Sequence, residues 1–327
     1  MNTVRLGKTG LEVSRIAYGA GVLGGAYGDL DEDAAAEAVR EARTLGINLF
    51  DTAPNYGESE VLLGRILADH LKTDRDEIII ATKCGLRMGQ VEQGENVVER
   101  DSSPEFLRGQ VDASLTRLGV DHIDIYQVHW PDPSVPLETT AAALHEIVAA
   151  GKIRHVGVSN FEPEEMEAFA RGGPVETLQP GYHLLFRQIE QRVLPYAQAN
   201  DVGVMVYGAL GHGMLTGSYD PDKPPGEMDW RRNHPLFVGE NVRENLRRVD
   251  ALAAFAREQG HSVRELAIAW TLAHPAVHTT IVGTTKVAHL REAVGAAAIE
   301  LSASDLASID AAMAGAVEID LFTPEEI

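Results

Sequence analysis

The sequence predicts an α/β fold in which eight parallel strands and their helices close into a (β/α)8 TIM barrel. Short runs rich in Ile and Val, typical of strands buried on both faces, alternate with helical patterns along the chain. Eight such runs match the number that closes a barrel: Ile16–Gly19, Ile47–Asp51, Ile78–Thr82, Ile123–His129, His155–Ser159, Thr177–Gln179, Gly203–Tyr207 and Thr280–Gly283. An open doubly wound sheet stays as the alternative, because periodicity does not show closure.

An N-terminal β-hairpin is predicted before the first barrel strand. Thr3–Leu6 and Leu11–Val13 read as short strands, and the Gly-Lys-Thr-Gly sequence between them supplies the turn. We expect this hairpin to plug the bottom of the barrel.

Residues typical of helix ends mark the segments between the strands. Asp31 opens a helix that runs to Leu45, and Ser103-Pro104-Glu105 combines a cap, a first-turn proline and an acidic residue before a helix that ends near Gly119. Further helices are predicted over Glu138–Ala150, Pro163–Ala170, Val242–Gln259 and Val263–Ala273.

No change of composition marks a domain boundary, so a single domain is predicted over residues 1–327. Gly208–Glu240 is rich in Gly and Pro with little periodicity, which predicts a long loop between strands seven and eight. The tail after Ala314 reads equally well as the edge of a lid or as a frayed end.

The charge balance excludes several classes of partner. The formal net charge is −21, without any run of Lys and Arg, so neither nucleic acid nor a membrane surface is an expected partner. Cys84 is the single cysteine, which excludes an intramolecular disulfide and is compatible with a reducing cytoplasm. The N-terminus has no apolar signal segment, and we therefore expect a cytoplasmic protein. No metal site is predicted.

The segment Gly19-Ala-Gly21-Val-Leu-Gly24 matches the dinucleotide fingerprint of a Rossmann fold and follows a strand. Its context does not fit that fold. Loop residues continue to the cap at Asp31, where the fingerprint requires a helix, and Asp51 lies too far along the chain to be the acidic residue of the motif. We therefore reject this interpretation.

Polar residues follow several of the predicted strands at their carboxyl ends, where barrel enzymes build their active sites. Asp51, Lys83 and His129 end three consecutive strands, and Tyr56 lies five residues after the first. Each of them has an ordinary structural interpretation when it is considered alone. Asp51 would be a helix cap, and Lys83 a solvated charge. His129 would be a core histidine, and Tyr56 a loop aromatic. Together they are more informative, because a buried lysine and histidine are unfavourable unless they are paired.

This combination can perform acid–base chemistry. A phenol has a pKa near 10, and a neighbouring ammonium lowers it by favouring the phenolate. Such a tyrosine donates a proton to a carbonyl oxygen as hydride reaches the carbon. A histidine at the same oxygen orients the substrate, and the hydride has to come from a cofactor.

The order Asp51, Tyr56, Lys83 and His129 resembles the catalytic tetrad of the aldo-keto reductase superfamily. The resemblance extends over nearly the whole chain. It includes Leu6-Gly-Lys-Thr-Gly-Leu11-Glu-Val-Ser14, Asn48-Leu-Phe-Asp51-Thr-Ala, Gly151-Lys-Ile-Arg154, Gly157-Val-Ser-Asn-Phe161 and Leu215-Thr-Gly217. The chain is most similar to the bacterial inositol-operon oxidoreductase type and the potassium-channel β-subunit branch, and Gly19–Gly28 also resembles the sugar 1-dehydrogenase branch.

The resemblance implies roles for individual residues. Tyr56 would be the acid, Lys83 and Asp51 would tune it, and His129 would orient the substrate. The nicotinamide cofactor would be contacted by Gly19, Ala20, Asp51, Ser159, Asn160, Gln179, Tyr207, Gly208, Ala209, Leu210, Gly211, Gly213, Gly283, Thr284, Thr285, Lys286, His289 and Glu292. A small carbonyl substrate would contact Tyr27, Tyr56, His129 and Trp130.

The implied cofactor is NADP, with NAD or dual use as the alternative. Gly283 and His289 occupy positions where many NADP-selective members carry a base, which leaves Lys286, Thr284 and Thr285 for the 2′-phosphate. The resemblance therefore implies NADP(H)-linked reduction of an aldehyde or ketone. The alternatives are an NAD-dependent sugar 1-dehydrogenase and a weakly active, cofactor-sensing binding subunit. The sequence predicts neither the natural substrate nor an oligomeric state.

Overall fold

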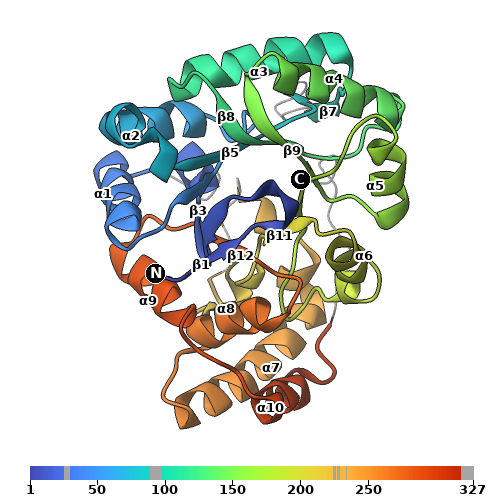
Figure 1. The fold of residues 1–327 in the computed structure, drawn as a ribbon. Coiled ribbons are helices and arrows are strands. Elements are labelled where there is room, and N and C mark those ends of the chain that lie inside the picture. The colour runs from blue at the N-terminus through green and yellow to red at the C-terminus, as the bar shows by residue number, and fades with distance from the viewer. Residues whose placement is uncertain (26–29, 89–97, 224–225, 227–228, 233, 318–327) are drawn as a thin grey trace.

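The computed structural model describes residues 1–25, 30–88, 98–223, 226, 229–232 and 234–317 (Figure 1). Eight parallel strands form a closed barrel in the order β10-β11-β12-β3-β4-β5-β8-β9, which confirms the predicted fold class. The barrel strands are β3 (Ile16–Gly19), β4 (Leu49–Asp51), β5 (Ile79–Cys84), β8 (Ile123–Val128), β9 (Ile153–Ser159), β10 (Thr177–Gln179), β11 (Gly203–Val206) and β12 (Thr279–Val282).

Helices surround the barrel (Figure 1). They are α1 (Glu32–Thr44), α2 (Ser59–Thr73), α3 (Pro104–Leu118), α4 (Leu137–Ala149), α5 (Pro163–Ala170), α6 (Val193–Ala199), α7 (Gly239–Glu258), α8 (Val263–Ala273), α9 (Val287–Ala296) and α10 (Ala303–Met313). The predicted helices are present, but α2, α6, α9 and α10 were missing from the prediction. Among the described residues, no helix is long and apolar enough to cross a bilayer.

The predicted hairpin, β1 (Thr3–Arg5) with β2 (Glu12–Ser14), pairs antiparallel and covers the amino-terminal end of the barrel (Figure 1). Leu6 and Val13 belong to the apolar cluster inside the barrel. At the turn, the backbone N–H of Lys8 donates to the carbonyl of Asp201 just before β11 (2.9 Å). The hairpin therefore closes the bottom of the barrel, as expected.

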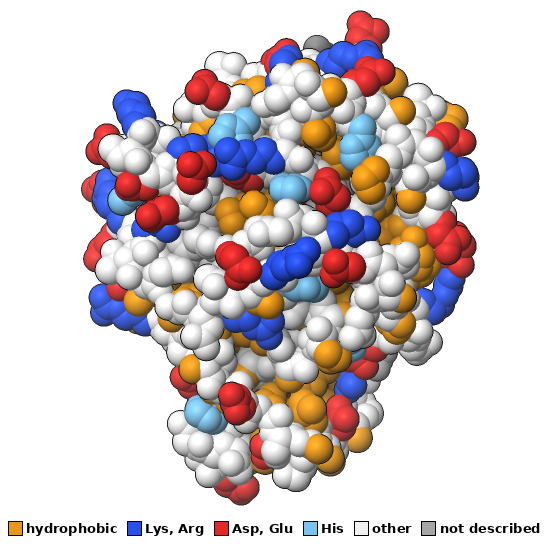
Figure 2. Space-filling model, in the orientation of Figure 1, with side chains coloured by type: hydrophobic (Ala, Val, Ile, Leu, Met, Phe, Trp, Pro, Cys, Tyr) orange, Lys and Arg blue, Asp and Glu red, His pale blue; other side chains and the backbone are white. Residues whose placement is uncertain are grey.

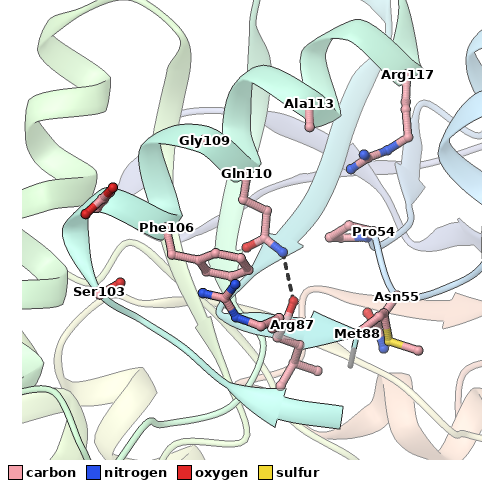
Figure 3. A pocket seen from close by; sticks show the side chains of 12 residues that line it. Pro54, Asn55, Arg87, Met88, Ser103, Phe106, Gly109, Gln110, Ala113 and Arg117 are labelled. Atoms are coloured by element: carbon pink, nitrogen blue, oxygen red, sulfur yellow. Dashed lines mark hydrogen bonds between the residues drawn. The ribbon is translucent and has the colours of Figure 1, made fainter. Parts of the chain in front are cut away.

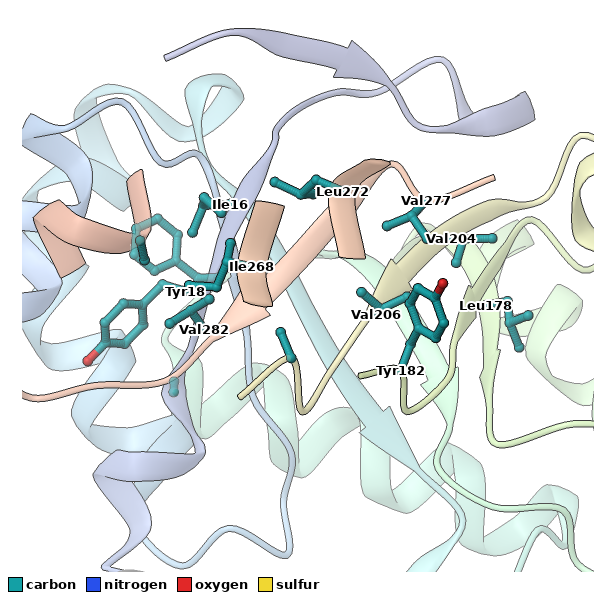
Figure 4. Packing of buried hydrophobic residues seen from close by; sticks show 14 of the residues in the cluster. Ile16, Tyr18, Leu178, Tyr182, Val204, Val206, Ile268, Leu272, Val277 and Val282 are labelled. Atoms are coloured by element: carbon teal, nitrogen blue, oxygen red, sulfur yellow. The ribbon is translucent and has the colours of Figure 1, made fainter. Parts of the chain in front are cut away.

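The larger apolar core lies between the outer face of the barrel and the helices. Ile16, Tyr18 and Val282, on adjacent strands, pack with Ile268 and Leu272 of α8 (Figure 4). Burial of this kind contributes about 25 cal/mol per Å² of apolar surface. It fixes the strand positions and so the positions of the side chains at the strand ends.

Two connections bear directly on the site. The chain from β11 to α7 contains the short 3-10 helices η5 (Gly211–Thr216), η6 (Trp230–Arg232) and η7 (Pro235–Phe237), where one long loop was predicted. A second hairpin, β6 (Leu86–Met88) with β7 (Val98–Arg100), follows β5. No strands were predicted there, because three-residue strands carry almost no periodic signal. The assignment of residues 1–327 to one domain stays a prediction.

Candidate active site

Asp51, Lys83 and His129 lie together at the carboxyl end of the barrel, as predicted. The Lys83 Nζ donates to Asp51 Oδ1 at 2.7 Å and to the carbonyl of Thr52 at 2.9 Å. The Lys83 side chain is 1 % exposed and that of Asp51 is 6 % exposed. Since a buried unpaired charge is strongly unfavourable, each group requires the other.

Tyr56 stands over this ion pair on the turn between β4 and α2. Its hydroxyl lies 3.5 Å from His129 Nε2, and the two rings meet edge to face with centroids 5.7 Å apart. The Lys83 ammonium lies 5.0 Å from the centre of the Tyr56 ring. A half-buried phenol is thus held between an imidazole and a buried cation.

The glycines that imitate a dinucleotide fingerprint position the Tyr56 turn. A Cβ added at Gly24 would lie 2.2 Å from the carbonyl oxygen of Tyr56, and one at Gly21 would contact the Tyr56 ring at 3.4 Å. The Ser59 hydroxyl, at the start of α2, donates to the carbonyl of Ala20 (2.6 Å). The closed barrel excludes a Rossmann fold, and the close approach of two backbones explains the requirement for glycine.

His129 is buried directly after β8. Its backbone N–H donates to the carbonyl of Cys84 (2.9 Å), and its own carbonyl accepts from Asn160 Nδ2 (3.1 Å). Burial, and secondarily the charge of Lys83, hold the pKa of the imidazole well below its ordinary value. His129 is therefore neutral near pH 7 and can act as a hydrogen-bonding group but not as a cationic acid.

The residues expected to contact the nicotinamide carboxamide lie beside the same ion pair. Gln179 Nε2 donates to the second oxygen of Asp51 (2.7 Å), and the Ser159 hydroxyl donates to the carbonyl of Gln179 (2.7 Å). Asn160 has a left-handed backbone (φ +61°), which turns its side chain toward His129 and Ser159. Asp51 therefore accepts hydrogen bonds from both the lysine and the glutamine.

Tyr207, immediately after β11, has a fixed ring. Its hydroxyl donates to Asn160 Oδ1 (2.9 Å), and a Cβ at Gly181 would come within 3.3 Å of its phenol. Burial, and secondarily the neighbouring Tyr56, raise the pKa of the Tyr207 phenol. Hydrogen bonds therefore connect the Tyr207 ring, through Asn160, to the residues that contact the ion pair.

Residues 208–213, expected to hold the diphosphate, form a tight loop after Tyr207. The N–H of Gly211 donates to the Gly208 carbonyl (2.7 Å) and the N–H of Gly213 donates to the Leu210 carbonyl (3.0 Å). From segment 229–232, Arg231 donates to the carbonyl of His212 (3.1 Å). Backbone hydrogen bonds thus hold residues 208–213, Ala209 among them, in a tight loop, and Arg231 connects this loop to segment 229–232.

The residues expected at the adenosine end follow β12 and start α9. Gly283 and Lys286 are exposed, Thr284 and Thr285 are half-buried, and His289 lies one turn along the helix. Glu292 pairs with Ser262 and with Arg264 of α8. Arg264 was not predicted, because its position in an ordinary amphipathic helix does not indicate that it contacts Glu292 of α9.

Of the expected substrate contacts beyond Tyr56 and His129, the structure describes Trp130 but not Tyr27. Tyr27 lies outside the described residues. Trp130 follows His129 and is 7 % exposed, with the Arg100 guanidinium 5.7 Å from its ring. Gly19 and Gly283 approach each other so closely that a Cβ at Gly283 would lie 2.9 Å from the Gly19 carbonyl oxygen.

A cavity of about 720 Å³ lies beside the Tyr56 turn, between α3 and β6 (Figure 3). Pro54 and Asn55 line one side, and the Arg87 guanidinium lies 4.4 Å from the centre of the Phe106 ring on the other. Neither Tyr56 nor His129 lines it. We therefore do not assign it to the substrate.

On the face shown in Figure 2, acidic and basic side chains are interspersed.

Comparisons with known proteins show the family of the chain. The model described as "Aldo/keto reductase family" matches residues 15–314. Aldo-keto reductase YhdN of Bacillus subtilis is 39 % identical over 294 residues, 89 % of this chain and 87 % of that protein. The NADH-specific methylglyoxal reductase of Escherichia coli is 34 % identical over 331 residues, 97 % of this chain and all of that protein (100 %).

A solved structure, that of the glycerol dehydrogenase AKR11B4 from Gluconobacter oxydans, superimposes with a TM-score of 0.88. The two chains are 35 % identical, and the match covers 99 % of this chain and 98 % of the other. The barrel of this chain is therefore similar to that solved structure over nearly its whole length.

Proposed function

The chain belongs to the aldo-keto reductase family and is an NAD(P)H-dependent oxidoreductase, and on that premise we propose that it reduces a small aldehyde or ketone to the alcohol. The observation that carries the proposal is the contact of Tyr56 with His129 above the buried Lys83–Asp51 pair. In this proposal Tyr56 is the general acid.

The strand-end residues fit a nicotinamide group. Tyr207 offers a flat face held by its bond to Asn160, and Ser159, Asn160 and Gln179 place amide and hydroxyl groups beside it. When bound there, the reduced cofactor supplies hydride to the carbonyl carbon. Since Gln179 Nε2 already donates to Asp51, Gln179 would meet a carboxamide through its oxygen.

The protein residues manage the proton. Tyr56 donates its hydroxyl proton to the carbonyl oxygen, and the nearby Lys83 ammonium stabilises the phenolate that remains. Neutral His129 orients the oxygen by hydrogen bonding. Asp51 and the Thr52 carbonyl hold the ammonium in place beneath the ring, so the charge does not move during the reaction.

NADP(H) is our first choice of cofactor. Lys286 is exposed beside Thr284, whose hydroxyl accepts from the Lys286 backbone N–H (3.1 Å), so a cation and a hydroxyl lie together at the adenosine end. The NADH specificity of the Escherichia coli relative supports NADH as the second choice. For the substrate, the methylglyoxal and glycerol in the names of two relatives support small, oxygenated carbonyl compounds.

The test is a Tyr56→Phe variant measured beside Tyr196→Phe, a control on α6. Cofactor binding is followed by quenching of protein fluorescence with NADPH and with NADH. Turnover is followed by loss of nicotinamide absorbance with methylglyoxal and short-chain aldehydes, and by its gain with NAD and aldoses. We expect Tyr56→Phe to lower kcat by about 10²–10⁴ with cofactor affinity unchanged. Full activity in Tyr56→Phe contradicts the assigned acid. Aldose oxidation with NAD favours the sugar dehydrogenase alternative, and tight binding without turnover favours the binding subunit.

A further inference from the structure

A buried carboxylate lies one turn after the proposed acid. Glu60, in the first turn of α2, is 1 % exposed. One of its oxygens accepts from the Thr82 hydroxyl of β5 (2.7 Å), and the other accepts from Arg117 Nε of α3 (2.6 Å). Glu60 therefore connects three elements of the fold, and the proton transfer described above makes no use of it.

Stability alone does not explain a charged group at this position. Burial of a carboxylate carries a large desolvation cost, and apolar residues of similar volume often replace buried ion pairs without loss of stability. An acidic residue near a helix N-terminus is favourable, but an exposed acid would gain this without being buried. An apolar side chain cannot form directional bonds. The two bonds of Glu60 fix where α2 begins relative to β5 and α3.

The bond to Thr82 attaches α2 to the strand that carries the lysine of the ion pair. Consecutive residues of a strand point to opposite faces of the sheet. Lys83 accordingly points inward to Asp51, whereas Thr82, which is fully buried, points outward to Glu60. The backbone that positions the ammonium is thus fixed to the first turn of the helix.

The Tyr56 turn is joined to the same end of α2. The N–H of Ser59 donates to the Tyr56 carbonyl (3.0 Å), and the Ser59 hydroxyl donates to the carbonyl of Ala20 (2.6 Å). Glu60 is the next residue along the chain. Its bond to β5 therefore connects the turn that carries the phenol with the strand that carries the ammonium.

The second partner of Glu60 comes from a helix that is packed closely against α2. A Cβ added at Gly64, one turn after Glu60, would lie 2.4 Å from the carbonyl oxygen of Leu118. Arg117, the residue before it, also donates to the Ser114 hydroxyl (3.3 Å). The carboxylate is thus held from both sides.

We propose that Glu60 is a positioning residue, which holds Tyr56 at its working distance from the Lys83 ammonium by fixing the start of α2 to β5. The inference rests on the proposed function. The ammonium lies 5.0 Å from the centre of the Tyr56 ring, and its stabilisation of the phenolate depends on this separation. A displacement of about 1 Å in a catalytic site can lower the rate about a hundredfold.

The experiment uses two substitutions of Thr82 that separate the hydrogen bond from the packing. Thr82→Val keeps the shape of the side chain and removes the hydroxyl, whereas Thr82→Ser keeps the hydroxyl and removes the methyl group. Thr271→Val is the matched control, because Thr271 of α8 and Thr280 of β12 form a buried helix–strand bond of the same kind (2.8 Å).

For each protein, kcat and KM are measured with methylglyoxal and short-chain aldehydes, using NADPH and NADH. Titration with the cofactor gives the fraction of active sites, and urea unfolding gives the stability. We expect Thr82→Val to lower kcat by about tenfold to a hundredfold, with KM and cofactor affinity unchanged. Thr82→Ser and Thr271→Val should lose stability but keep the kcat of the wild type.

A wild-type kcat in Thr82→Val overturns the inference, and so does a loss of kcat in Thr82→Ser as large as that in Thr82→Val. Either result means that turnover does not depend on the bond. If Thr82→Val does not fold, Glu60→Gln replaces it, because an amide offers one oxygen where the carboxylate offers two. The same loss of kcat is then expected, and a wild-type kcat overturns the inference.

All of these outcomes leave the proposed function intact. A wild-type protein that reduces none of the carbonyl compounds with either cofactor overturns the proposed function, and the inference with it.

Discussion

The buried Lys83–Asp51 pair gives the most demanding test of the site. We predict that Lys83→Met and Asp51→Asn each lower the free energy of unfolding by about 3–5 kcal/mol, because each change leaves a buried partner without its counter-ion. The geometry supports a value in this range, since the ammonium makes bonds of 2.7 and 2.9 Å and both side chains are almost completely buried.

The double variant distinguishes pairing from simple burial. Removing the second partner of the pair relieves the stranded charge of the first, so the Lys83→Met/Asp51→Asn protein should be more stable than the sum of the two losses implies. We expect a coupling energy of about 2–3 kcal/mol, at the upper end for residues in direct contact.

Urea unfolding of the four proteins, with the slope of each transition compared, measures this cycle. The control is the same pair of substitutions at Lys152 and Asp112, an ion pair whose side chains are 38 % and 58 % exposed. It should change stability by at most about 1 kcal/mol. Losses at Lys83 and Asp51 that add within about 0.5 kcal/mol would refute the claim that each charge depends on the other.

Two further predictions follow from the packing and the protonation states. Gly24→Ala should reduce kcat and destabilise the protein by about 1–3 kcal/mol, because the new methyl group displaces the Tyr56 turn. Gly109→Ala, in α3 with nothing within 4 Å, should be neutral or stabilising, and equal behaviour of the two contradicts the packing argument. Because the depressed pKa of buried His183 makes the unfolded chain bind more protons, stability should fall as the pH drops below about 6.5, by up to about 1.4 kcal/mol per unit for this residue. Unfolding curves of His183→Gln should have a shallower pH dependence, and an unchanged slope would contradict it.

The barrel and much of its candidate site could be predicted from sequence because barrel geometry is repetitive. Once eight buried strands are recognised, the residues that end them must meet at one face, which is why Asp51, Lys83 and His129 were expected together. Tyr56 followed because it lies on the short turn after one of those strands. The prediction of these four positions required only the order of the strands, and no contact between residues distant in the sequence.

Other features depend on distances that a sequence does not contain. The partner of Gln179 proved to be Asp51, 128 residues away in the chain, and Arg264 reaches Glu292 from a neighbouring helix. The glycines at positions 21 and 24 could be recognised as unsuited to a Rossmann fold, but their contact with Tyr56 could not. The three-residue strands β6 and β7 are too short to give a periodic signal.

The Lys83–Asp51 pair beneath Tyr56, the proposed acid, and the predicted nicotinamide contacts belong to one hydrogen-bond network. Asp51 accepts from Lys83 on one oxygen and from Gln179 on the other, while Asn160 accepts from Tyr207 and donates to the carbonyl of His129. Buried networks of this kind hold their members in fixed geometry, and the loss of one bond disturbs the others. We therefore expect a substitution at Gln179 to change the position of the Lys83 ammonium, which lies 5.0 Å from the centre of the Tyr56 ring. Gln179 would act in this way although its strand lies on the opposite side of the barrel from β4, which precedes the Tyr56 turn.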